Sequence, residues 1–364
     1  MEYRKLPHGT EQLSILGLGN SSLSAASEKE QQKTIEQALD CGMNLFDFAA
    51  ADAAPFAAFG KAVGSRRKDV YYQIHFGANY ETGVYGWTLD LDKVRRSVSW
   101  QLDTLKTDYI DFGFIHCIDE LSDLQQFEEN GILSYMQSLK EKGVIHHFGL
   151  SSHTPAVVHA LLDRGFLDLV MFSINPAYDY RHGEYAIGSS GERMALYRRC
   201  EALGVGISVM KPFCGGQLLN AGTSPFSAAL TQAQCLQYAL DKPAVLTVLP
   251  GVRGFEDLQR ILSFLDTPAE ARDYSVLGTF APVDAKGACV YCNHCAPCPQ
   301  GLDVGLINKY YDLAKAGDEL ARDHYLHLAK KAGACVGCGH CDRRCPFSVE
   351  QSRRMREIAA YFGA

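Results

Sequence analysis

Short apolar runs alternate with segments of helical periodicity from residue 13 to about residue 265. A short apolar run predicts a buried strand, whereas apolar residues three or four apart predict a helix with one buried face. Leu91, Val94 and Val98 show the second pattern. The eight predicted strands are Leu13 to Leu18, Met43 to Ala49, Val70 to Phe76, Tyr109 to His116, His147 to Ser151, Leu169 to Asn175, Val205 to Pro212 and Val245 to Pro250.

Eight strand–helix units in roughly 250 residues have the size of a (β/α)8 barrel. We therefore predict an α/β fold in which residues 1–265 form a TIM barrel. Residues 266–287 contain two prolines and lack a clear period, so we predict a linker there. Residues 288–364 are expected to form a small α-helical, ferredoxin-like domain. Its apolar spacing fits two helices between 304 and 328, and a last helix follows Ser348, where Ser-Val-Glu-Gln matches a capping box.

Composition narrows the classes of function. The chain has 364 residues, of which 47% are hydrophobic and 21% charged, as in ordinary globular proteins. The net charge of -7 gives no general attraction to nucleic-acid phosphates. No stretch approaches about 18 uncharged apolar residues, and the N-terminus lacks the apolar core of a signal peptide. We expect a cytoplasmic protein that acts on a small-molecule substrate, without nucleic acid or membrane as a partner.

Cysteine is unusually frequent, and eight of the 13 cysteines form two groups near the C-terminus. The second group reads Cys-x2-Cys-x2-Cys-x3-Cys-Pro, the bacterial [4Fe-4S] run in which three thiolates bind one cube and the fourth binds the other cluster. The first group reads Cys-x2-Cys-x2-Cys-x2-Cys-Pro, the same pattern with one residue fewer before its last cysteine. The predicted ligand sets are Cys289, Cys292, Cys295 and Cys345 for one cluster, and Cys335, Cys338, Cys341 and Cys298 for the other.

Two structural zinc sites are the alternative, because four thiolates also suit a tetrahedral Zn²⁺ ion. Zinc pairs do not call for three consecutive x2 spacings followed by Cys-Pro, so we favour two [4Fe-4S] clusters. Such clusters pass single electrons, which predicts a redox protein and a possible redox partner protein. The remaining cysteines are expected to be small buried hydrophobic residues: Cys41, Cys117, Cys200, Cys214 and Cys235.

Reacting groups of a (β/α)8 barrel lie at the C-terminal ends of its strands. Asp47, Asp52, His75 and His116 are expected to converge there, either as an open metal site or as hydrogen-bonded groups without an ion. We interpret His153 as the end of a turn before Thr154-Pro155, with Thr154 as a helix N-cap. The polar residues at the predicted strand ends are Asp47, His75, His116, Ser151, Ser152, His153, Asn175, Lys211 and Gly251 to Arg253.

Further stretches of the chain are specific in combination. They are Tyr3-Arg4-Lys5-Leu6, Leu16-Gly17-Leu18-Gly19, Gly42-Met43-Asn44-Leu45-Phe46-Asp47, Asp108-Tyr109-Ile110-Asp111, Phe148-Gly149-Leu150-Ser151-Ser152, Val209-Met210-Lys211-Pro212 and Leu249-Pro250-Gly251. Over nearly its whole length the chain resembles the aldo/keto reductases, in particular the subgroup with a C-terminal ferredoxin-like domain. The resemblance implies a barrel that reduces carbonyls with NADPH through an Asp, Tyr, Lys and His tetrad.

Half of this tetrad is present when the family pattern is carried over. Asp47 and His116 match, whereas the expected Tyr falls on Asp52 and the expected Lys on His75. An aspartate at its ordinary pKa of about 4 is already ionised and does not donate a proton as a tyrosine does. Four tyrosines lie nearby in the sequence, and the spacing selects none of them as a replacement: Tyr71, Tyr72, Tyr80 and Tyr85.

The resemblance also implies a cofactor site. Ser151 and Ser152 stand where the family binds the nicotinamide amide, and phosphates are expected at Lys211. Close backbone approach adds four further candidates for phosphate binding, which are Gly215, Gly216, Gly251 and Arg253. NADP(H) and a flavin both remain candidates.

Our leading hypothesis is an iron–sulfur oxidoreductase that couples two [4Fe-4S] clusters to redox chemistry at the barrel mouth, with Asp47, Asp52, His75 and His116 as the catalytic residues. One alternative is an electron-transfer or partner-binding protein with an inactive barrel. The other is a metal-dependent barrel enzyme that uses the same four residues.

Overall fold

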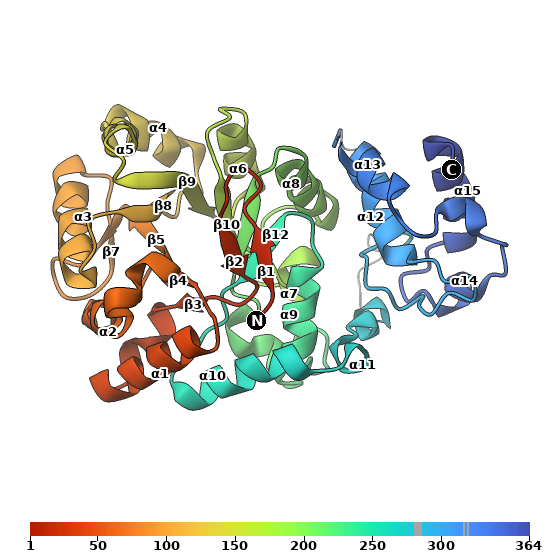
Figure 1. The fold of residues 1–364 in the computed structure, drawn as a ribbon, viewed down its shortest axis with the longest axis horizontal. Coiled ribbons are helices and arrows are strands. Elements are labelled where there is room, and N and C mark those ends of the chain that lie inside the picture. The colour runs from red at the N-terminus through yellow and green to blue at the C-terminus, as the bar shows by residue number, and fades with distance from the viewer. Residues whose placement is uncertain (280–285, 316, 319) are drawn as a thin grey trace. The chain divides into compact units, whose positions relative to one another are not determined.

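The computed structural model describes residues 1–279, 286–315, 317, 318 and 320–364. In this part of the chain, eight parallel strands alternate with helices (Figure 1). They pair in the order β12-β11-β10-β9-β8-β5-β4-β3. The strands are β3 (Leu18–Gly19), β4 (Leu45–Phe48), β5 (Tyr71–Phe76), β8 (Ile110–Ile115), β9 (Ile145–Ser152), β10 (Leu169–Ser173), β11 (Gly206–Met210) and β12 (Val245–Val248).

The curled sheet closes on itself. Val248 at the end of β12 pairs in parallel with Leu16, which lies just before β3. The N–H of Gly17 donates to the carbonyl oxygen of Val248 at 2.9 Å. This is the arrangement of the predicted (β/α)8 barrel, in which the C-terminal ends of all eight strands meet at one mouth.

The first predicted strand, Leu13 to Leu18, is divided in the structure. Its beginning belongs to β2 (Gln12–Ser14), which pairs antiparallel with β1 (Tyr3–Lys5). Only Leu18 and Gly19 pair with the next barrel strand. The hairpin has its own apolar role, because Leu6 and Leu13 are fully buried in one cluster with side chains of the barrel strands.

Contacts group the described chain into two units. The first contains residues 1–174, 205–212 and 246–266, and the second contains residues 175–204, 213–245 and 267–364. The first unit has helices α1 (Glu28–Asp40), α2 (Ala54–Val63), α3 (Leu91–Leu105), α4 (Leu121–Glu129), α5 (Ile132–Glu141), α6 (Pro155–Leu162) and α10 (Phe255–Leu262). The second has α7 (Pro176–Asp179), α8 (Ser190–Ala202), α9 (Gln232–Leu240), α11 (Ala269–Arg272), α12 (Val304–Lys315), α13 (Leu320–Leu326), α14 (His340–Arg344) and α15 (Gln351–Phe362).

The second unit therefore joins the C-terminal residues to helices that follow β10 and β11, rather than beginning at a single cut near residue 265. Within the predicted linker 266–287, residues 280–285 lie outside the described residues, and α11 occupies part of the remainder.

The C-terminal helices have their own apolar core. Ile307 of α12, Tyr325 of α13 and Met355 of α15 are fully buried in one cluster. The last helix begins at Gln351, but the predicted capping box is wrong. Ser348 has a left-handed backbone (φ 54°) and its N–H donates to the carbonyl of Cys345, so it belongs to the turn after the cysteines and not to the helix start.

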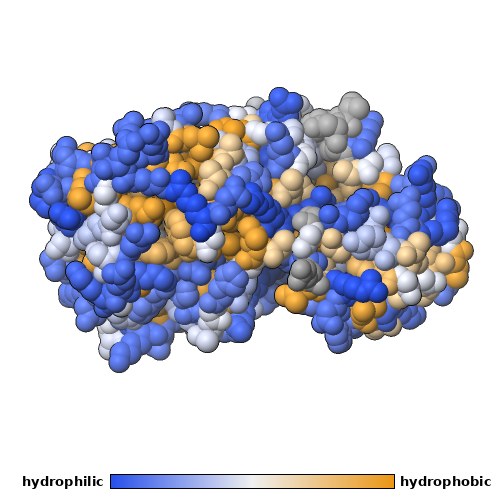
Figure 2. All heavy atoms as spheres, turned by 90° about the horizontal axis from the view of Figure 1, so that it is seen from above, coloured by the Kyte–Doolittle hydropathy of each residue, from blue (hydrophilic) through white to orange (hydrophobic). Residues whose placement is uncertain are grey.

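Among the described residues, no helix combines the length and the apolar character that a membrane span requires. On the face drawn in Figure 2, hydrophilic side chains predominate and apolar patches lie between them.

A buried ion pair fixes β5 against β8, the two strands that lead to His75 and His116. Asp111 on β8 accepts from Arg67 at 2.7 Å and from the N–H of Tyr72 on β5 at 2.9 Å. The guanidinium lies 3.9 Å from the ring centre of Tyr72. Both members of the pair are at most 10% exposed.

Replacing Asp111 with Ala would leave the Arg67 charge buried without its carboxylate. We expect the free energy of unfolding to fall by about 3–5 kcal/mol, measured by urea denaturation. As a control, Arg253→Ala removes the exposed partner of Asp257 and should cost less than about 1 kcal/mol. Equal effects of the two substitutions would show that the buried pair does not hold the strands.

Candidate active site at the barrel mouth

Four side chains at the barrel mouth form one continuous chain of hydrogen bonds. Asp47 Oδ1, on β4, lies 2.7 Å from His75 Nε2 of β5. His75 Nδ1 lies 2.9 Å from Nδ1 of His116, which follows β8. Nε2 of His116 lies 2.8 Å from the phenol oxygen of Tyr85. Gln73 also donates to Asp47 Oδ1, at 2.9 Å, and so orients the carboxylate. We call Asp47, His75, His116 and Tyr85 the first relay.

One arrangement of protons satisfies every nitrogen of the first relay. A carboxylate only accepts, so His75 Nε2–H donates to Asp47 and leaves His75 Nδ1 as an acceptor. His116 Nδ1–H then donates to His75, and His116 Nε2 accepts from the Tyr85 hydroxyl. Burial and the neighbouring His75 and His153 lower the pKa of His116 well below its usual value, which keeps this imidazole neutral. Burial and nearby Cys117 raise the pKa of Tyr85, so its phenol keeps its proton.

Tyr85 reaches this position through a hairpin that sequence periodicity did not reveal. β6 (Ala78–Asn79) and β7 (Gly86–Trp87) pair antiparallel just after β5. Gly77 allows the turn, because it has φ 125° and a Cβ there would lie 3.1 Å from His116 Cβ. The hairpin is also bonded to the loop after β4, where the N–H of Tyr85 donates to the carbonyl of Ala51 at 2.9 Å.

The hairpin thus places a tyrosine beside position 52, where the family pattern expects one. Asp52 pairs with Val84 across an antiparallel bridge. Its carboxylate accepts from the N–H of Ala54 at 2.9 Å, at the start of α2. The structure therefore brings Asp47, His75 and His116 together and adds Tyr85, whereas Asp52 makes a local turn.

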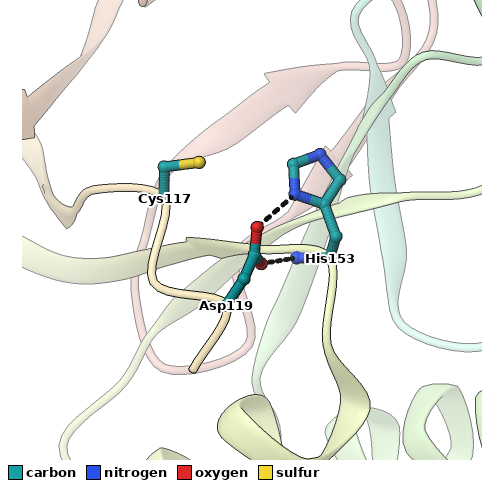
Figure 3. Close-up of side chains that lie close together, drawn as sticks. All are labelled: Cys117, Asp119 and His153. Atoms are coloured by element: carbon teal, nitrogen blue, oxygen red, sulfur yellow. Dashed lines mark hydrogen bonds and ion pairs between the residues drawn. The ribbon is translucent and has the colours of Figure 1, made fainter. Parts of the chain in front are cut away.

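A second hydrogen-bonded chain lies at the same mouth (Figure 3). Asp119 accepts from Nδ1 of His153 at 2.9 Å and from its backbone N–H at 2.6 Å. On the other side of the ring, Nε2 of His153 lies 2.8 Å from Lys211 Nζ. Ser152 donates to Asp119 at 3.1 Å. We call Asp119, His153 and Lys211 the second relay. His153 is thus more than the end of a turn, and Thr154 makes no side-chain cap.

Cys117 lies between the two relays. Its thiol acts electrostatically on Tyr85 and is in turn affected by Asp119 and Lys211. Burial and the Asp119 carboxylate raise the pKa of Cys117 to about 11. Cys117 and Lys211 both have left-handed backbones, with φ of 49° and 56°, which non-glycine residues adopt at a cost of about 1–3 kcal/mol. The expectation that Cys117 is only a small buried hydrophobic residue is therefore wrong.

Both relays contain residue types that can bind a metal ion. In the described part of the chain, the group with three possible ligands within 4.8 Å of one another is Cys117, Asp119 and His153. A metal-bound histidine usually donates its other N–H to an oxygen, but Nε2 of His153 faces the Lys211 amine. The arrangement therefore suits proton transfer better than a bound ion. The four residues of the metal-dependent alternative do not form such a group, because both nitrogens of His75 and His116 are engaged in the first relay.

The residues expected to bind a nicotinamide or phosphates make contacts with the protein itself. Ser151 accepts from the N–H of Cys117 at 2.8 Å, and Ser152 is engaged with Asp119. Arg253 pairs with Asp257 at 3.1 Å, with its side chain otherwise exposed, next to exposed Gly251. Gly215 and Gly216 lie in the second unit, where both have left-handed backbones and space for a Cβ.

The cysteines of the two C-terminal groups are free thiols, and the described residues contain no disulfide. Burial raises the pKa of Cys289 to about 11 and that of Cys292 to about 12. The charge of Cys292 interacts with Cys289 and Cys345, so the last cysteine of the second group lies near the first group. Cys295 interacts in the same way with Cys289, Cys292 and Cys341.

Hydrogen-bond donors face several of these sulfurs. Gln351 Nε2 donates to Cys289 Sγ at 3.7 Å, the N–H of Val349 donates to Cys345 Sγ at 3.4 Å, and the N–H of Gly337 donates to Cys335 Sγ at 3.4 Å. Such donors favour the thiolate, the form in which cysteine binds metals.

Comparison with known proteins identifies the family. The model of the aldo/keto reductase family matches residues 15–229. The chain belongs to the aldo/keto reductase family. It is therefore an oxidoreductase. It is 27% identical over 289 residues to the uncharacterized oxidoreductase YqkF of Bacillus subtilis, an alignment that covers 71% of this chain and 89% of that protein. It is 24% identical over 292 residues to L-galactose dehydrogenase of Arabidopsis thaliana, covering 71% and 86%.

Solved structures show the same fold. The holo form of the aldo-keto reductase AKR11C1 from Bacillus halodurans has a TM-score of 0.60 at 24% identity, covering 75% of this chain and 94% of that one. An aldo/keto reductase from Klebsiella pneumoniae, in complex with NADP and acetate, has a TM-score of 0.53 at 20% identity, covering 71% and 88%.

The buried imidazoles predict how stability depends on pH. The pKa of His116 is lowered in the fold, so the unfolded chain takes up this proton first, and stability is lost as pH falls below about 6.5, by up to about 1.4 kcal/mol per pH unit. His116→Gln should reduce this loss, as measured by urea midpoints at pH 7.5 and 5.5.

The pKa of His147 is raised by Asp168 and Glu11 against the effect of burial, so its contribution to the free energy of unfolding is present at low pH and lost as pH rises. His147→Gln should therefore make the loss of stability at acid pH steeper. The same change in both variants would contradict the opposite pKa shifts of His116 and His147.

Proposed function

We propose that this chain is an iron–sulfur oxidoreductase in which the first relay delivers protons to a substrate at the barrel mouth and two [4Fe-4S] clusters are bound by the C-terminal cysteines. The observation that carries the proposal is the unbroken series of hydrogen bonds from Asp47 to the phenol of Tyr85. The phenol is the outer end of the series. Tyr85 is 38% exposed, whereas Asp47, His75 and His116 are at most 5% exposed.

The proton step follows from the order of donors and acceptors. In the oxidation of an alcohol, the Tyr85 oxygen accepts the hydroxyl proton while its own proton passes to His116 Nε2. The imidazolium formed there is stabilised by Asp47 through His75. In the reduction of a carbonyl to an alcohol, the substrate takes up two electrons and two protons. The two reduced clusters would supply one electron each. Tyr85 donates one proton to the substrate oxygen, and water supplies the second proton and reprotonates the exposed phenol. Val84 and Trp87 are 58% and 43% exposed on the same hairpin, so an apolar group beside the carbonyl suits this mouth.

The spacing of the cysteines along the chain supports clusters over single ions, because zinc pairs do not call for three consecutive x2 spacings followed by Cys-Pro. The interaction of Cys345 with Cys292 matches the assignment of Cys345 to the cluster of the first group, which leaves Cys298 for the second. The interaction of Cys295 with Cys341 joins cysteines that are assigned to different clusters. A bound [4Fe-4S] cluster supplies or removes single electrons, and a redox partner protein is the expected source.

A nicotinamide is less well supported. The Klebsiella pneumoniae structures contain NADP or NADPH. In this chain, two of the residues at which the family resemblance places the nicotinamide or its phosphates contact other side chains. Ser152 bonds to Asp119, and Lys211 bonds to His153.

The cluster assignment predicts the metal content. Protein reconstituted anaerobically with iron and sulfide should hold about eight iron atoms per chain and give electron paramagnetic resonance (EPR) signals of reduced [4Fe-4S] centres. Cys289→Ser should lose about half of the iron, because it removes a ligand of one cluster. Cys41→Ser is the control and should keep all of it, since Cys41 bonds only to Gln37 on α1. Zinc in place of iron, or no metal, would refute the assignment.

The proton relay predicts a selective loss of activity. Tyr85→Phe should lower the rate of reduction of benzaldehyde, a general carbonyl probe without a nitro group that titanium(III) would reduce, by about 100- to 10,000-fold, because the proton donor is lost. Tyr80→Phe is a matched control. Tyr80 is a buried neighbour on the same hairpin whose hydroxyl donates to the carbonyl of Ala50, 3.2 Å away, and not to His116. The assay uses titanium(III)-reduced protein, with NADPH in a parallel series. An unchanged rate in Tyr85→Phe would exclude Tyr85 as the donor.

A further inference from the structure

Lys242 is a buried cation beside the first cysteine group. It lies between α9 and β12 and is 1% exposed. Its Nζ lies 3.5 Å from the carbonyl oxygen of Val290, the residue after Cys289. The ring centres of Tyr238 and Tyr274 lie 3.7 and 5.6 Å from the same nitrogen. All of these residues belong to the second unit.

The contacts of Lys242 do not balance its charge. Burying an ammonium group costs several kcal/mol unless an anion accompanies it. Asp179 and Asp241 are the two anions that act most strongly on Lys242, but neither is paired with it, and other donors hold both carboxylates. Asp179 accepts from Arg193 at 2.7 Å and from two tyrosines, and Asp241 accepts from Tyr274 at 2.9 Å. A carbonyl and two aromatic faces stabilise the ammonium only in part.

The missing negative charge lies on the cysteine side. Cys289 and Cys292 act electrostatically on Lys242. In turn, Lys242 lowers the pKa of Cys292 against the larger effect of burial. Cys345 acts on the same Cys292 thiol. Four thiolates around an iron–sulfur cube carry a net negative charge, so a cluster at this position would face Lys242 directly.

The other cysteine group has a different environment. Cys338 is exposed, and Val336 beside it is 64% exposed, so water screens charges there. Arg343 contacts the carbonyl of Cys338 from an exposed position. The two groups therefore differ in that one lies beside a buried cation and the other includes an exposed cysteine.

We propose that Lys242 is the counter-charge of the cluster held by Cys289, Cys292, Cys295 and Cys345 and makes it the more easily reduced of the two. The inference rests on the proposed function, since it requires both clusters. Reduction adds one electron to an already anionic group, and a nearby buried cation stabilises the added charge. An electron that enters at the exposed cluster then passes to the cluster beside Lys242, where it is bound more strongly.

The test measures the potential of each cluster in the reconstituted full chain. A redox titration followed by EPR should resolve two midpoint potentials in the native protein. Lys242→Met keeps the length of the side chain and removes its charge, and it should lower the higher midpoint while the lower one stays unchanged. Lys242→Arg should preserve both. Lys286→Met removes an exposed charge three residues before Cys289 and should leave both unchanged, because water screens it.

Iron content and far-ultraviolet circular dichroism are compared for every variant. Lys242→Gln replaces the Met variant if that protein does not take up iron. Unchanged midpoints, equal shifts of both, or a single midpoint in the native protein would overturn the role of Lys242 and leave the proposed function intact. Native protein without iron and sulfide after reconstitution would instead overturn the proposed function itself.

Discussion

The hydrogen bond between the imidazoles of His75 and His116 is the contact on which the proposed chemistry depends. It joins two neighbouring strands, and it requires a side chain at position 75 that accepts on one side while it donates on the other. An ammonium group only donates, so a lysine at this position would end the series. With an imidazole there, the carboxylate of Asp47 influences a phenol that it does not touch. The exchange of a lysine for a histidine therefore changes the connectivity of the site as well as its charge.

The second relay follows the same logic with a different end group. Asp119 fixes one nitrogen of His153, and the other nitrogen meets Lys211. Both relays begin on a carboxylate and pass through imidazole, and Cys117 is electrostatically coupled to members of each. The mouth of this barrel is thus a set of coupled proton donors and acceptors in which a change at one residue alters its neighbours. Effects of double substitutions across the two relays should not add.

Periodicity predicts seven of the eight barrel strands, whereas the predicted strand Leu13 to Leu18 is divided between β2 and β3. The predicted strand ends include Asp47, His75 and His116, because a parallel barrel places such residues at one mouth. Tyr85 could not be selected, since its position depends on a hairpin turn at Gly77 and on backbone bonds to the loop at Ala51. Asp119 lies in a loop without a repeating pattern. The role of His153 in the second relay could not be predicted, because the Thr154-Pro155 pair after it indicates the start of a helix and favours a turn at His153. The ligand spacing of the cysteines is readable because it is local in the chain.

The second unit contains contacts between residues that are synthesised at very different times. Arg198 of α8 contacts both Asp312 of α12 and the hydroxyl of Tyr291, so a helix from the middle of the chain is bound to residues near its end. A ribosome releases α8 more than a hundred residues before its partner helix is available. During synthesis α8 is therefore without these partners until the cysteine-bearing segment emerges. The cysteine-bearing part is consequently no detachable module, because a single boundary before it would separate α8 from Tyr291 and Asp312.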